Sequence, residues 1–327
     1  MSIRTIAILN PGEMGAAIGA CLVTGGQRVV WASAGRSAAT RSRANTARLE
    51  DLGTLERALG AANVVLSVCP PHGALALARE VAGLGFRGIY VDANAISPET
   101  ARNVGRAVEK AGASFVDGGI IGPPPVEGAR SRMYLSGKSC EQIASLFAGG
   151  NLEAIPLRAP AGAASALKAC YAAWTKGATA LLAAIRALAE HEGVQVALLG
   201  EWKLSQPELQ KRSEAVTAQA RKAWRWIGEM EEIAASFEAA GLPGGFHLAA
   251  ADLYRRLEGF KGGTTPPALA EVTAAIRRAA PGRKASSGAR RRSSVREQEE
   301  TAPARFKFGT AAVKRDAAKR LRSLKRS

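Results

Sequence analysis

The spacing of hydrophobic residues changes character near the middle of the chain. Up to about residue 157, short β-rich apolar runs alternate with longer Ala-, Leu- and Arg-rich segments of helical character. The run Val64-Val65-Leu66 is apolar at every position, as in strands buried on both faces of a parallel sheet. Strands spaced regularly by helices predict βαβ units. The predicted strands cover residues 3–9, 28–32, 63–68, 88–92 and 114–117.

Beyond residue 157 the pattern is helical as far as about residue 278. A long Ala-rich helix is expected to begin near Pro160, because proline is tolerated in a first turn, and to end at Gly193. Further helices are predicted over 206–240, 247–257 and 267–278. The chain is therefore predicted to hold an α/β domain over 1–158 and an all-α domain over 159–280.

Composition adds a third region to this division. With 327 residues, 47% of them hydrophobic, the chain is long enough for two domains with buried cores. Residues 281–327 are Arg-, Lys- and Ser-rich without an apolar face and carry most of the formal net charge of +17. We expect this segment to be a disordered basic tail. Its arginine cluster at 290–292 could contact nucleic acid non-specifically, but no recognition motif accompanies it.

The cysteines and the charged residues indicate where in the cell the protein is found and which kinds of site it lacks. The four cysteines lie far apart without a C-x-x-C pair, which argues against a disulfide framework or a zinc site. The most apolar stretch, 159–189, is interrupted by Lys168, Lys176 and Arg186, and therefore resembles a buried helix more than a membrane span. The first residues also lack the apolar core of a signal peptide. We expect a cytoplasmic protein that holds no metal.

A glycine-containing turn follows the first predicted strand and opens a helix. Dinucleotide-binding turns of the Rossmann fold have the pattern G-x-G-x-x-G in this position. Gly12 and Gly15 match the second and third glycines, and Asn10 stands at the first, where a left-handed backbone is required and asparagine tolerates it. The alternative is a structural turn without a ligand. The expected cofactor contacts are Asn10, Pro11, Gly12, Glu13 and Met14.

The segment after the second strand favours one nicotinamide cofactor over the other. An NAD site favours an acidic residue about twenty residues past the glycine turn, where it binds the ribose hydroxyls. This chain has Ser33, Arg36 and Ser37 there instead. A guanidinium and two hydroxyls suit a 2′-phosphate, so NADP is expected to bind in preference to NAD. A solvated basic loop is the alternative interpretation.

Several segments together resemble a known superfamily. Gly12-x-Met14-Gly15 resembles the G-x-M-G turn of the β-hydroxyacid and 6-phosphogluconate dehydrogenases. The segments 67–71, 91–98 and 115–122 and the glycine-to-lysine spacing from Gly162 to Lys168 follow in the family order. The segments 223–232 and 241–247 resemble the less characterised helical C-terminal domain of one branch of these proteins.

The resemblance implies roles for residues outside the glycine turn. It places Cys69, Pro70 and Asn94 near the cofactor and assigns Lys168 as the catalytic general acid/base. It further implies an oxidoreductase acting on a small hydroxy acid or related carbonyl compound, and a homodimer formed through the helical half. The substrate contacts that it implies are Ser97, Gly118, Gly119, Ile120, Tyr171 and Thr175.

The sequence departs from the superfamily pattern at three positions. Ile121 stands where the family has a substrate-binding serine, and Tyr171-Ala172 replaces the asparagine pair after the lysine. Thr175 occupies the position of the glutamate that serves decarboxylation, so decarboxylation is not expected. These departures leave open a non-catalytic NADPH-binding module with the same fold. Imine reduction is a further alternative, against which Lys168 argues because the lysine is usually replaced in imine-reducing relatives.

Lys168 has chemical grounds of its own for a catalytic role. It is the only charged residue between Ala161 and Thr175 on an Ala-rich helix. Apolar surroundings disfavour the ammonium form and lower the pKa of a lysine toward the range useful for proton transfer. A lysine whose amino group reaches water along the helix surface is the alternative.

Overall fold

A single eight-stranded sheet forms the core of the first half in the computed structural model, which describes residues 5–278. The strands are β1 Thr5–Leu9, β2 Arg28–Trp31, β3 Glu50–Asp51, β4 Val64–Ser67, β5 Ile89–Asp92, β6 Ser114–Ile121, β7 Ser131–Ser136 and β8 Leu152–Pro156. Their order is β3-β2-β1-β4-β5-β6-β7-β8, and every neighbouring pair is parallel except β6–β7. The predicted mostly parallel α/β fold is confirmed.

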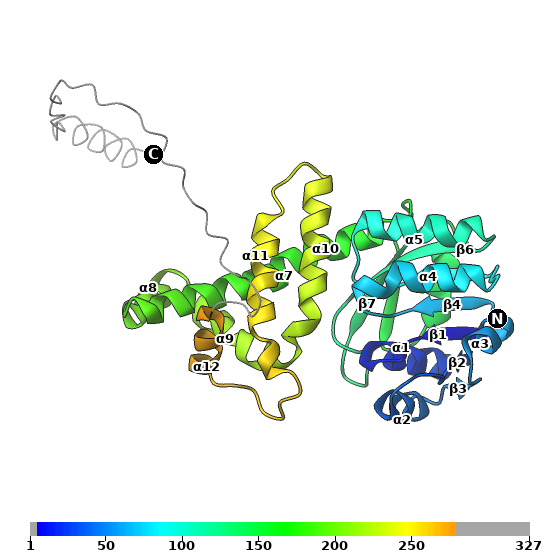
Figure 1. The fold of residues 1–327 in the computed structure, drawn as a ribbon, viewed down its shortest axis with the longest axis horizontal. Coiled ribbons are helices and arrows are strands. Elements are labelled where there is room, and N and C mark those ends of the chain that lie inside the picture. The colour runs from blue at the N-terminus through cyan, green and yellow to red at the C-terminus, as the bar shows by residue number, and fades with distance from the viewer. Residues whose placement is uncertain (1–4, 279–327) are drawn as a thin grey trace, which may run out of the picture. The chain divides into compact units, whose positions relative to one another are not determined.

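Helices cover both faces of this sheet (Figure 1). The helices are α1 Glu13–Thr24, α2 Ala38–Thr46, α3 Leu55–Ala61, α4 Ala74–Gly83, α5 Pro98–Lys110 and α6 Cys140–Ala144. Side chains of β1 alternate between two cores: Ile6 and Ile8 pack with α1 and α6, while Ala7 and Leu9 pack with α3, α4 and α5. Burial on both faces explains the continuous apolar runs in the central strands.

Three strands were not predicted, and one is longer than expected. β3 has only two residues, both exposed, and its charged sequence carries no strand signal. β6 continues four residues past the predicted end, through Gly118 and Gly119, because β7 pairs with it in antiparallel register from Asp117 to Ile121. Glycine has low strand propensity, so the partner strand and not the local sequence extends β6. The stretch from Gly118 to Ile120, where substrate contacts are expected, is therefore a buried strand.

The second half of the described chain consists of helices around a third core. The long helix expected from residue 160 to 193 is confirmed. The helix predicted over 206–240 is interrupted by a 3₁₀ segment, Ala220–Arg225, and the helix after residue 194 was not predicted. These helices are α7 Ala163–His191, α8 Gln195–Ser205, α9 Glu208–Gln219, α10 Trp226–Ala239, α11 Gly245–Arg256 and α12 Leu269–Arg277.

The change from strands to helices falls between β8 and α7, close to the predicted domain boundary at residue 158. The division into two domains remains a prediction. The basic tail predicted over 281–327 lies outside the described residues. Within residues 5–278, no helix has both the length and the apolar character needed to cross a bilayer.

Candidate functional site

The turn between β1 and α1 has the geometry that dinucleotide binding requires. Asn10 adopts the left-handed backbone expected of it, with φ +63°, and its carbonyl oxygen accepts a hydrogen bond from the Gly12 N–H at 2.7 Å. A Cβ on Gly15 would lie 2.9 Å from the Asn10 carbonyl oxygen, so only glycine lets α1 pack this closely. A Cβ on Gly12 would meet nothing within 4 Å, and no side chain caps α1. Open space before an uncapped helix N-terminus fits a pyrophosphate group.

The other expected contacts of this turn differ in how accessible they are. Pro11 is buried, and Met14 packs against the core on the α1 side of the sheet. The Glu13 carboxylate turns toward the helical half, where Arg225 lies at 3.0 Å and Lys222 at 3.3 Å. Hydrogen bonding and charge from these two residues lower the pKa of Glu13 to about 2. Gly12 is therefore the residue of the turn that offers open space to a ligand.

The three residues expected at the 2′-phosphate lie after β2, at the same edge of the sheet. The Ser37 hydroxyl caps α2 by accepting a hydrogen bond from the Thr40 N–H at 3.3 Å. The Ser33 N–H donates to the Asp51 carboxylate at 3.2 Å. Arg36 is exposed; its backbone N–H donates to the Ser33 carbonyl oxygen at 3.0 Å, and its side chain makes no ion pair or hydrogen bond within residues 5–278. The guanidinium of Arg36 is thus free to meet an anionic ligand, and its role at NADP remains a prediction.

Asn94 joins the loops that follow β4 and β5. Its side-chain oxygen accepts the Cys69 N–H at 2.5 Å, and its amide nitrogen donates to Ser67 at 3.1 Å and to Asp92 at 2.8 Å. Asn94 is only 2% exposed, so its side chain holds these loops together and its expected contact with the cofactor remains a prediction. Burial and the nearby Asp92 charge raise the pKa of the Cys69 thiol to about 11, which keeps it protonated at neutral pH. Pro70 is exposed beside it.

Two buried carboxylates stand side by side on β5 and β6. Asp92 and Asp117 are partners in the parallel register. Burial raises the pKa of Asp92 to about 7. Asp117 accepts hydrogen bonds from the Ser165 hydroxyl at 2.5 Å and from the Gly162 N–H at 2.8 Å. Asp117 therefore fastens the N-terminus of α7 to the sheet and fixes the position of Lys168 on the next turns.

Gly118 and Gly119 serve close packing in this structure. A Cβ on Gly118 would lie 2.9 Å from the Asp92 carbonyl oxygen, and one on Gly119 would lie 2.5 Å from the Ala164 carbonyl oxygen. Ile120 is buried in the sheet core. The space next to these three residues, where substrate contact was expected, is thus occupied by the protein itself.

Ser97 also has a structural role. Its hydroxyl caps α5 by accepting the Thr100 N–H at 3.1 Å, and the residue is only 3% exposed. The Glu232 carboxylate, from α10, accepts hydrogen bonds from the Ser97 N–H at 2.7 Å and the Thr100 hydroxyl at 2.9 Å. The first turn of α5, where substrate contact was expected, is therefore covered by a carboxylate from the helical half.

Lys168 lies on α7 where the two halves meet. It lines a small space of about 10 Å³ together with Ala95, Ile96, Glu229 and Glu232. Burial lowers the pKa of Lys168, as expected from its apolar helix; Lys176 also lowers it, whereas Glu229 and Asp92 act to raise it. The lysine is thus placed beside the loop after β5, with a pKa shifted in the direction that favours proton transfer.

The sequence did not indicate that Glu229 lies near Lys168. Glu229 on α10 is 8% exposed and forms an ion pair with Lys176 at 2.9 Å. The carbonyl oxygen of Lys176 accepts a hydrogen bond from the Tyr254 hydroxyl at 2.6 Å. Glu229 carries no local motif, and the one available signal was an acidic residue on an otherwise apolar helix face. Glu229 thus brings a carboxylate from another helix to the junction, next to Lys176.

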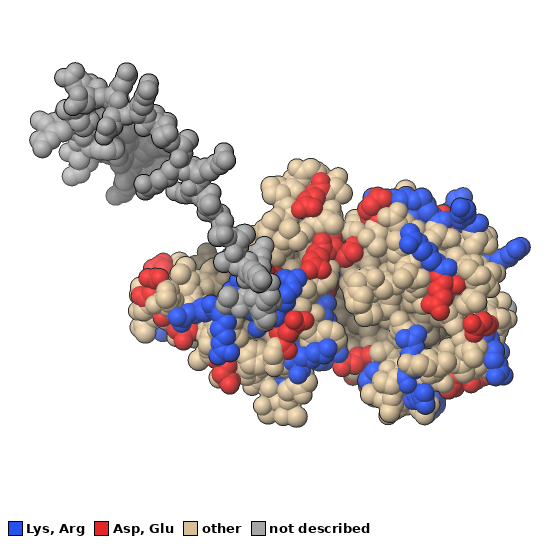
Figure 2. All heavy atoms as spheres, in the orientation of Figure 1, with Lys and Arg blue, Asp and Glu red and all other residues tan. Residues whose placement is uncertain are grey.

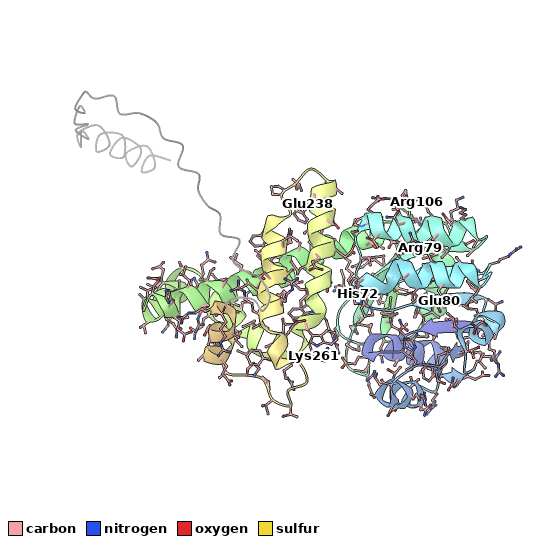
Figure 3. The ribbon with its side chains drawn as sticks, in the orientation of Figure 1. His72, Arg79, Glu80, Arg106, Glu238 and Lys261 are labelled. Atoms are coloured by element: carbon pink, nitrogen blue, oxygen red, sulfur yellow. The ribbon has the colours of Figure 1, made fainter. Side chains whose placement is uncertain are left out.

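The junction around this site is built from several contacts between the halves. A Cβ on Gly228 would lie 3.9 Å from the Pro71 ring, so the start of α10 lies against the 3₁₀ turn Pro71–Gly73. Figure 3 shows His72 of that turn at the junction. Tyr171 is 48% exposed, and the Thr175 hydroxyl donates to the Tyr171 carbonyl oxygen at 3.1 Å. Their substrate contacts remain predictions.

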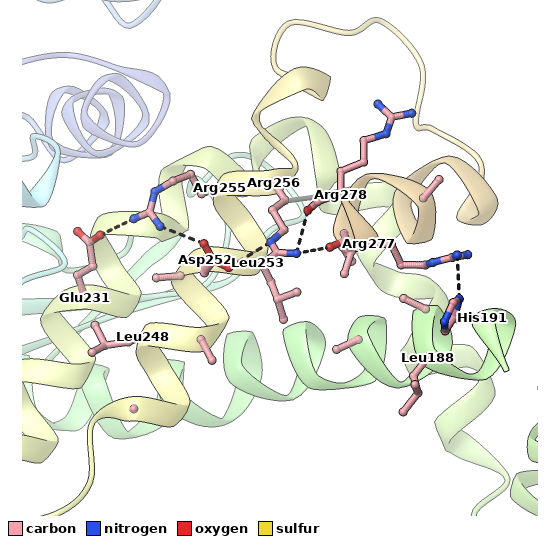
Figure 4. A pocket seen from close by; sticks show the side chains of 17 residues that line it. Leu188, His191, Glu231, Leu248, Asp252, Leu253, Arg255, Arg256, Arg277 and Arg278 are labelled. Atoms are coloured by element: carbon pink, nitrogen blue, oxygen red, sulfur yellow. Dashed lines mark hydrogen bonds and ion pairs between the residues drawn. The ribbon is translucent and has the colours of Figure 1, made fainter. Parts of the chain in front are cut away.

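A larger groove, of about 1390 Å³, lies elsewhere on the helical half. It is lined by α7, α11 and α12, with Glu231, Asp252, Arg255 and Arg256 joined in a chain of ion pairs and hydrogen bonds (Figure 4). None of the predicted site residues lines it. Among residues 5–278, no group of His, Cys, Asp and Glu has an arrangement that would hold a metal ion.

Comparisons with solved structures place this architecture among known proteins. A conserved protein of unknown function, described as structurally similar to 3-hydroxyacid dehydrogenases, is 27% identical, with a TM-score of 0.60 over 78% of this chain and 98% of its own. The 3-hydroxyisobutyrate dehydrogenase of Mycobacterium tuberculosis, solved with L-serine, is 18% identical, with a TM-score of 0.64 over 85% and 100%. A reductive aminase from Aspergillus terreus, solved with NADPH and ethyl levulinate, is 17% identical, with a TM-score of 0.51 over 84% and 100%.

The chain therefore has the fold of the hydroxyacid dehydrogenase-like proteins, and the resemblance that its motifs indicated is confirmed. Within that class, residues 189–257 match DUF1932, a domain of unknown function. This match lies wholly in the helical half and includes Glu229, Glu232 and Arg225. No curated protein matches the sequence.

Proposed function

We propose that the protein is an NADP-dependent oxidoreductase in which Lys168 acts as the general acid/base. The observation that carries this proposal is the placement of Lys168, with its pKa lowered by burial, at the junction beside the loop after β5. The dinucleotide-type turn at Gly12 lies at the same carboxyl edge of the parallel sheet. Ligands of open α/β sheets bind at this edge. The similarity to a dehydrogenase and to a reductive aminase solved with NADPH supports a nicotinamide cofactor.

The chain's own residues supply binding and proton transfer in this proposal. The nicotinamide, when bound, supplies the exchange of a hydride with the substrate carbon. The backbone at Gly12 accommodates the pyrophosphate, and Arg36 with Ser33 and Ser37 pairs with the 2′-phosphate. Lys168 takes the proton from a substrate hydroxyl during oxidation and returns it during reduction.

We propose a small hydroxy acid or related carbonyl compound as the substrate. Its hydroxyl or carbonyl oxygen would lie within hydrogen-bond distance of the Lys168 amino group. Ile121 offers no hydroxyl where the related enzymes have a substrate-binding serine. The substrate's remaining groups are therefore expected to differ from those of the 3-hydroxyisobutyrate dehydrogenases.

A cofactor-consumption panel tests this function. The purified protein is incubated with NADPH and carbonyl compounds, or with NADP and hydroxy acids, and absorbance at the nicotinamide band is followed. Turnover with at least one compound supports the oxidoreductase. Tight NADPH binding without turnover on any hydroxy acid, aldehyde or imine would favour a non-catalytic NADPH-binding module instead.

We also propose that the chain forms a homodimer through α7. Tyr171, Trp174, Leu181 and Leu188 are 44–64% exposed and recur at intervals of three or seven residues, so they share one helix face. An exposed apolar stripe of this kind is typical of an interface between chains. Leu181→Glu combined with Leu188→Glu should yield monomers by light scattering with unchanged helical content. Leu84→Glu, at an exposed leucine of the other half, is the control.

A further inference from the structure

Two cations of the helical half reach across to the first turn of α1. The Arg225 guanidinium holds both oxygens of the Glu13 carboxylate, at 3.0 and 3.2 Å, and Lys222 lies 3.3 Å from one of them. The three side chains are 40–59% exposed. Figure 2 shows basic and acidic atoms meeting at the junction between the halves. Glu13 directly follows Gly12, where the turn offers open space.

Charge makes this cluster unusual for its position. A carboxylate on the first residue of α1 lies next to the expected pyrophosphate and would repel it. Two cations around one carboxylate leave a net charge of +1, which reverses that effect. Arg225 also lies 5.4 Å from the ring centre of Trp224, and Lys261 lies 4.2 Å from the same ring. Three cations therefore gather at this edge, and Figure 3 shows Lys261 at the end of the helical half that faces α1.

We propose that Arg225 and Lys222 belong to the cofactor site and bind the pyrophosphate from the helical half. The inference rests on the proposed NADP-dependent function. Glu13 holds the two side chains near the turn, and the pyrophosphate takes over as their partner. Guanidinium and ammonium groups suit this role because both form charge-assisted hydrogen bonds with phosphate oxygens. The segment Ala220–Arg225 thereby links cofactor binding to the helical half.

A purely structural tie between the halves predicts a different outcome. If the ion pairs only hold the halves together, then removing either partner breaks them, and Glu13→Gln and Arg225→Ala should have the same sign of effect. If Arg225 binds the pyrophosphate, the two substitutions act in opposite directions. Arg225→Ala removes a ligand, whereas Glu13→Gln removes a competing anion and frees the cations.

Equilibrium binding of NADPH and of NADH, followed by nicotinamide fluorescence, tests the inference in the full chain. Arg225→Ala is expected to weaken both cofactors by about tenfold, because both carry the pyrophosphate. Lys222→Ala is expected to weaken both by a smaller factor, and Glu13→Gln is expected to leave affinity equal or higher. The matched control is Arg255→Ala, since Arg255 is similarly exposed and pairs with Glu231 within the helical half.

The outcomes separate this inference from the proposed function. Two results would overturn the inference alone, provided that the unmodified chain binds the cofactor. One is an unchanged cofactor affinity in Arg225→Ala. The other is a loss of affinity in Glu13→Gln as large as that in Arg225→Ala. A selective loss of NADPH affinity in Arg225→Ala would move the contact to the 2′-phosphate and would overturn the pyrophosphate assignment. No binding of either cofactor by the unmodified chain would overturn both proposals.

Discussion

The cofactor side and the substrate side of the candidate site use their motif residues differently. On the cofactor side, Gly12 faces open space, and the Arg36 side chain has no hydrogen bond or ion pair among the described residues. On the substrate side, Ser97 is buried with its N–H and hydroxyl hydrogen-bonded, and the space beside Gly119 is occupied by α7. The first set remains available to a ligand, and the second holds the protein together.

This difference shows where the chemistry of the substrate side comes from. The loops after β5 and β6 position the helices, while the charged groups that face the junction come from α7 and α10. Lys168, Lys176 and Glu229 form that group. The motif that resembles hydroxyacid dehydrogenases therefore identifies the scaffold on this side, and we expect the helical half to determine the substrate.

The largest effect is expected at Lys168. Lys168→Met keeps the apolar part of the side chain and removes the group that carries the proton. Turnover should fall by about 10²–10⁴-fold, while NADPH affinity in a fluorescence titration stays within a few-fold. Lys110→Met, at an exposed lysine ending α5, is the control. Activity that survives in Lys168→Met would place the proton transfer elsewhere and remove the distinction between the two sides.

The preference for NADPH over NADH tests whether the unpaired Arg36 side chain binds the 2′-phosphate. Arg36→Ala should weaken NADPH by about ten- to hundredfold, as for a charge-assisted hydrogen bond of about 1.5–3 kcal/mol, and should leave NADH nearly unchanged. Parallel titrations with both cofactors measure the ratio, and Arg57→Ala on α3 is an exposed control. Equal affinities for NADPH and NADH in the unmodified protein would rule out the NADP assignment.

Alanine substitutions at Gly12 and Gly119 compare a position that faces open space with one that is tightly packed. Gly119→Ala places a methyl group against the Ala164 carbonyl oxygen and should lower the free energy of unfolding by about 1–3 kcal/mol. Gly12→Ala meets no protein atom within 4 Å, so it should change stability by less than about 1 kcal/mol but weaken cofactor binding. Urea denaturation and NADPH titration of both variants check this. If Gly12→Ala were destabilised and still bound NADPH with unchanged affinity, Gly12 would serve packing and not the cofactor.

The smallest effect concerns the proton affinity of Lys168. Burial lowers its pKa, Lys176 on the same helix lowers it further, and Glu229 on α10 and Asp92 on β5 oppose the change. Glu229→Gln should therefore lower the pKa of Lys168 further, whereas Lys176→Met should raise it. Acetic anhydride labelling across a pH series, read by peptide mass spectrometry, measures the neutral amine. Shifts of the same sign in both variants would contradict the charge arrangement at the junction.

The sequence by itself determined the elements that depend on local backbone and periodicity. It predicted the central strands, the long α7 helix, the left-handed Asn10 and the isolated Lys168, because each follows from spacing or from a conformation that few residue types adopt. It missed β7 and β8, and it ended β6 at Asp117, because pairing with a neighbouring strand extends a glycine-containing segment that has little strand propensity of its own.

Only the tertiary structure decided which distant residues meet and what each polar group is used for. Glu229 reaches the vicinity of Lys168, and Arg225 reaches Glu13, because α10 and the preceding 3₁₀ segment lie against the edge of the sheet. Asp117 and Ser97 carry residue types that suit a binding site, yet their hydrogen bonds fasten helices. A carboxylate or hydroxyl has the same donors and acceptors in either role, so its use is fixed by its neighbours, which the sequence does not name.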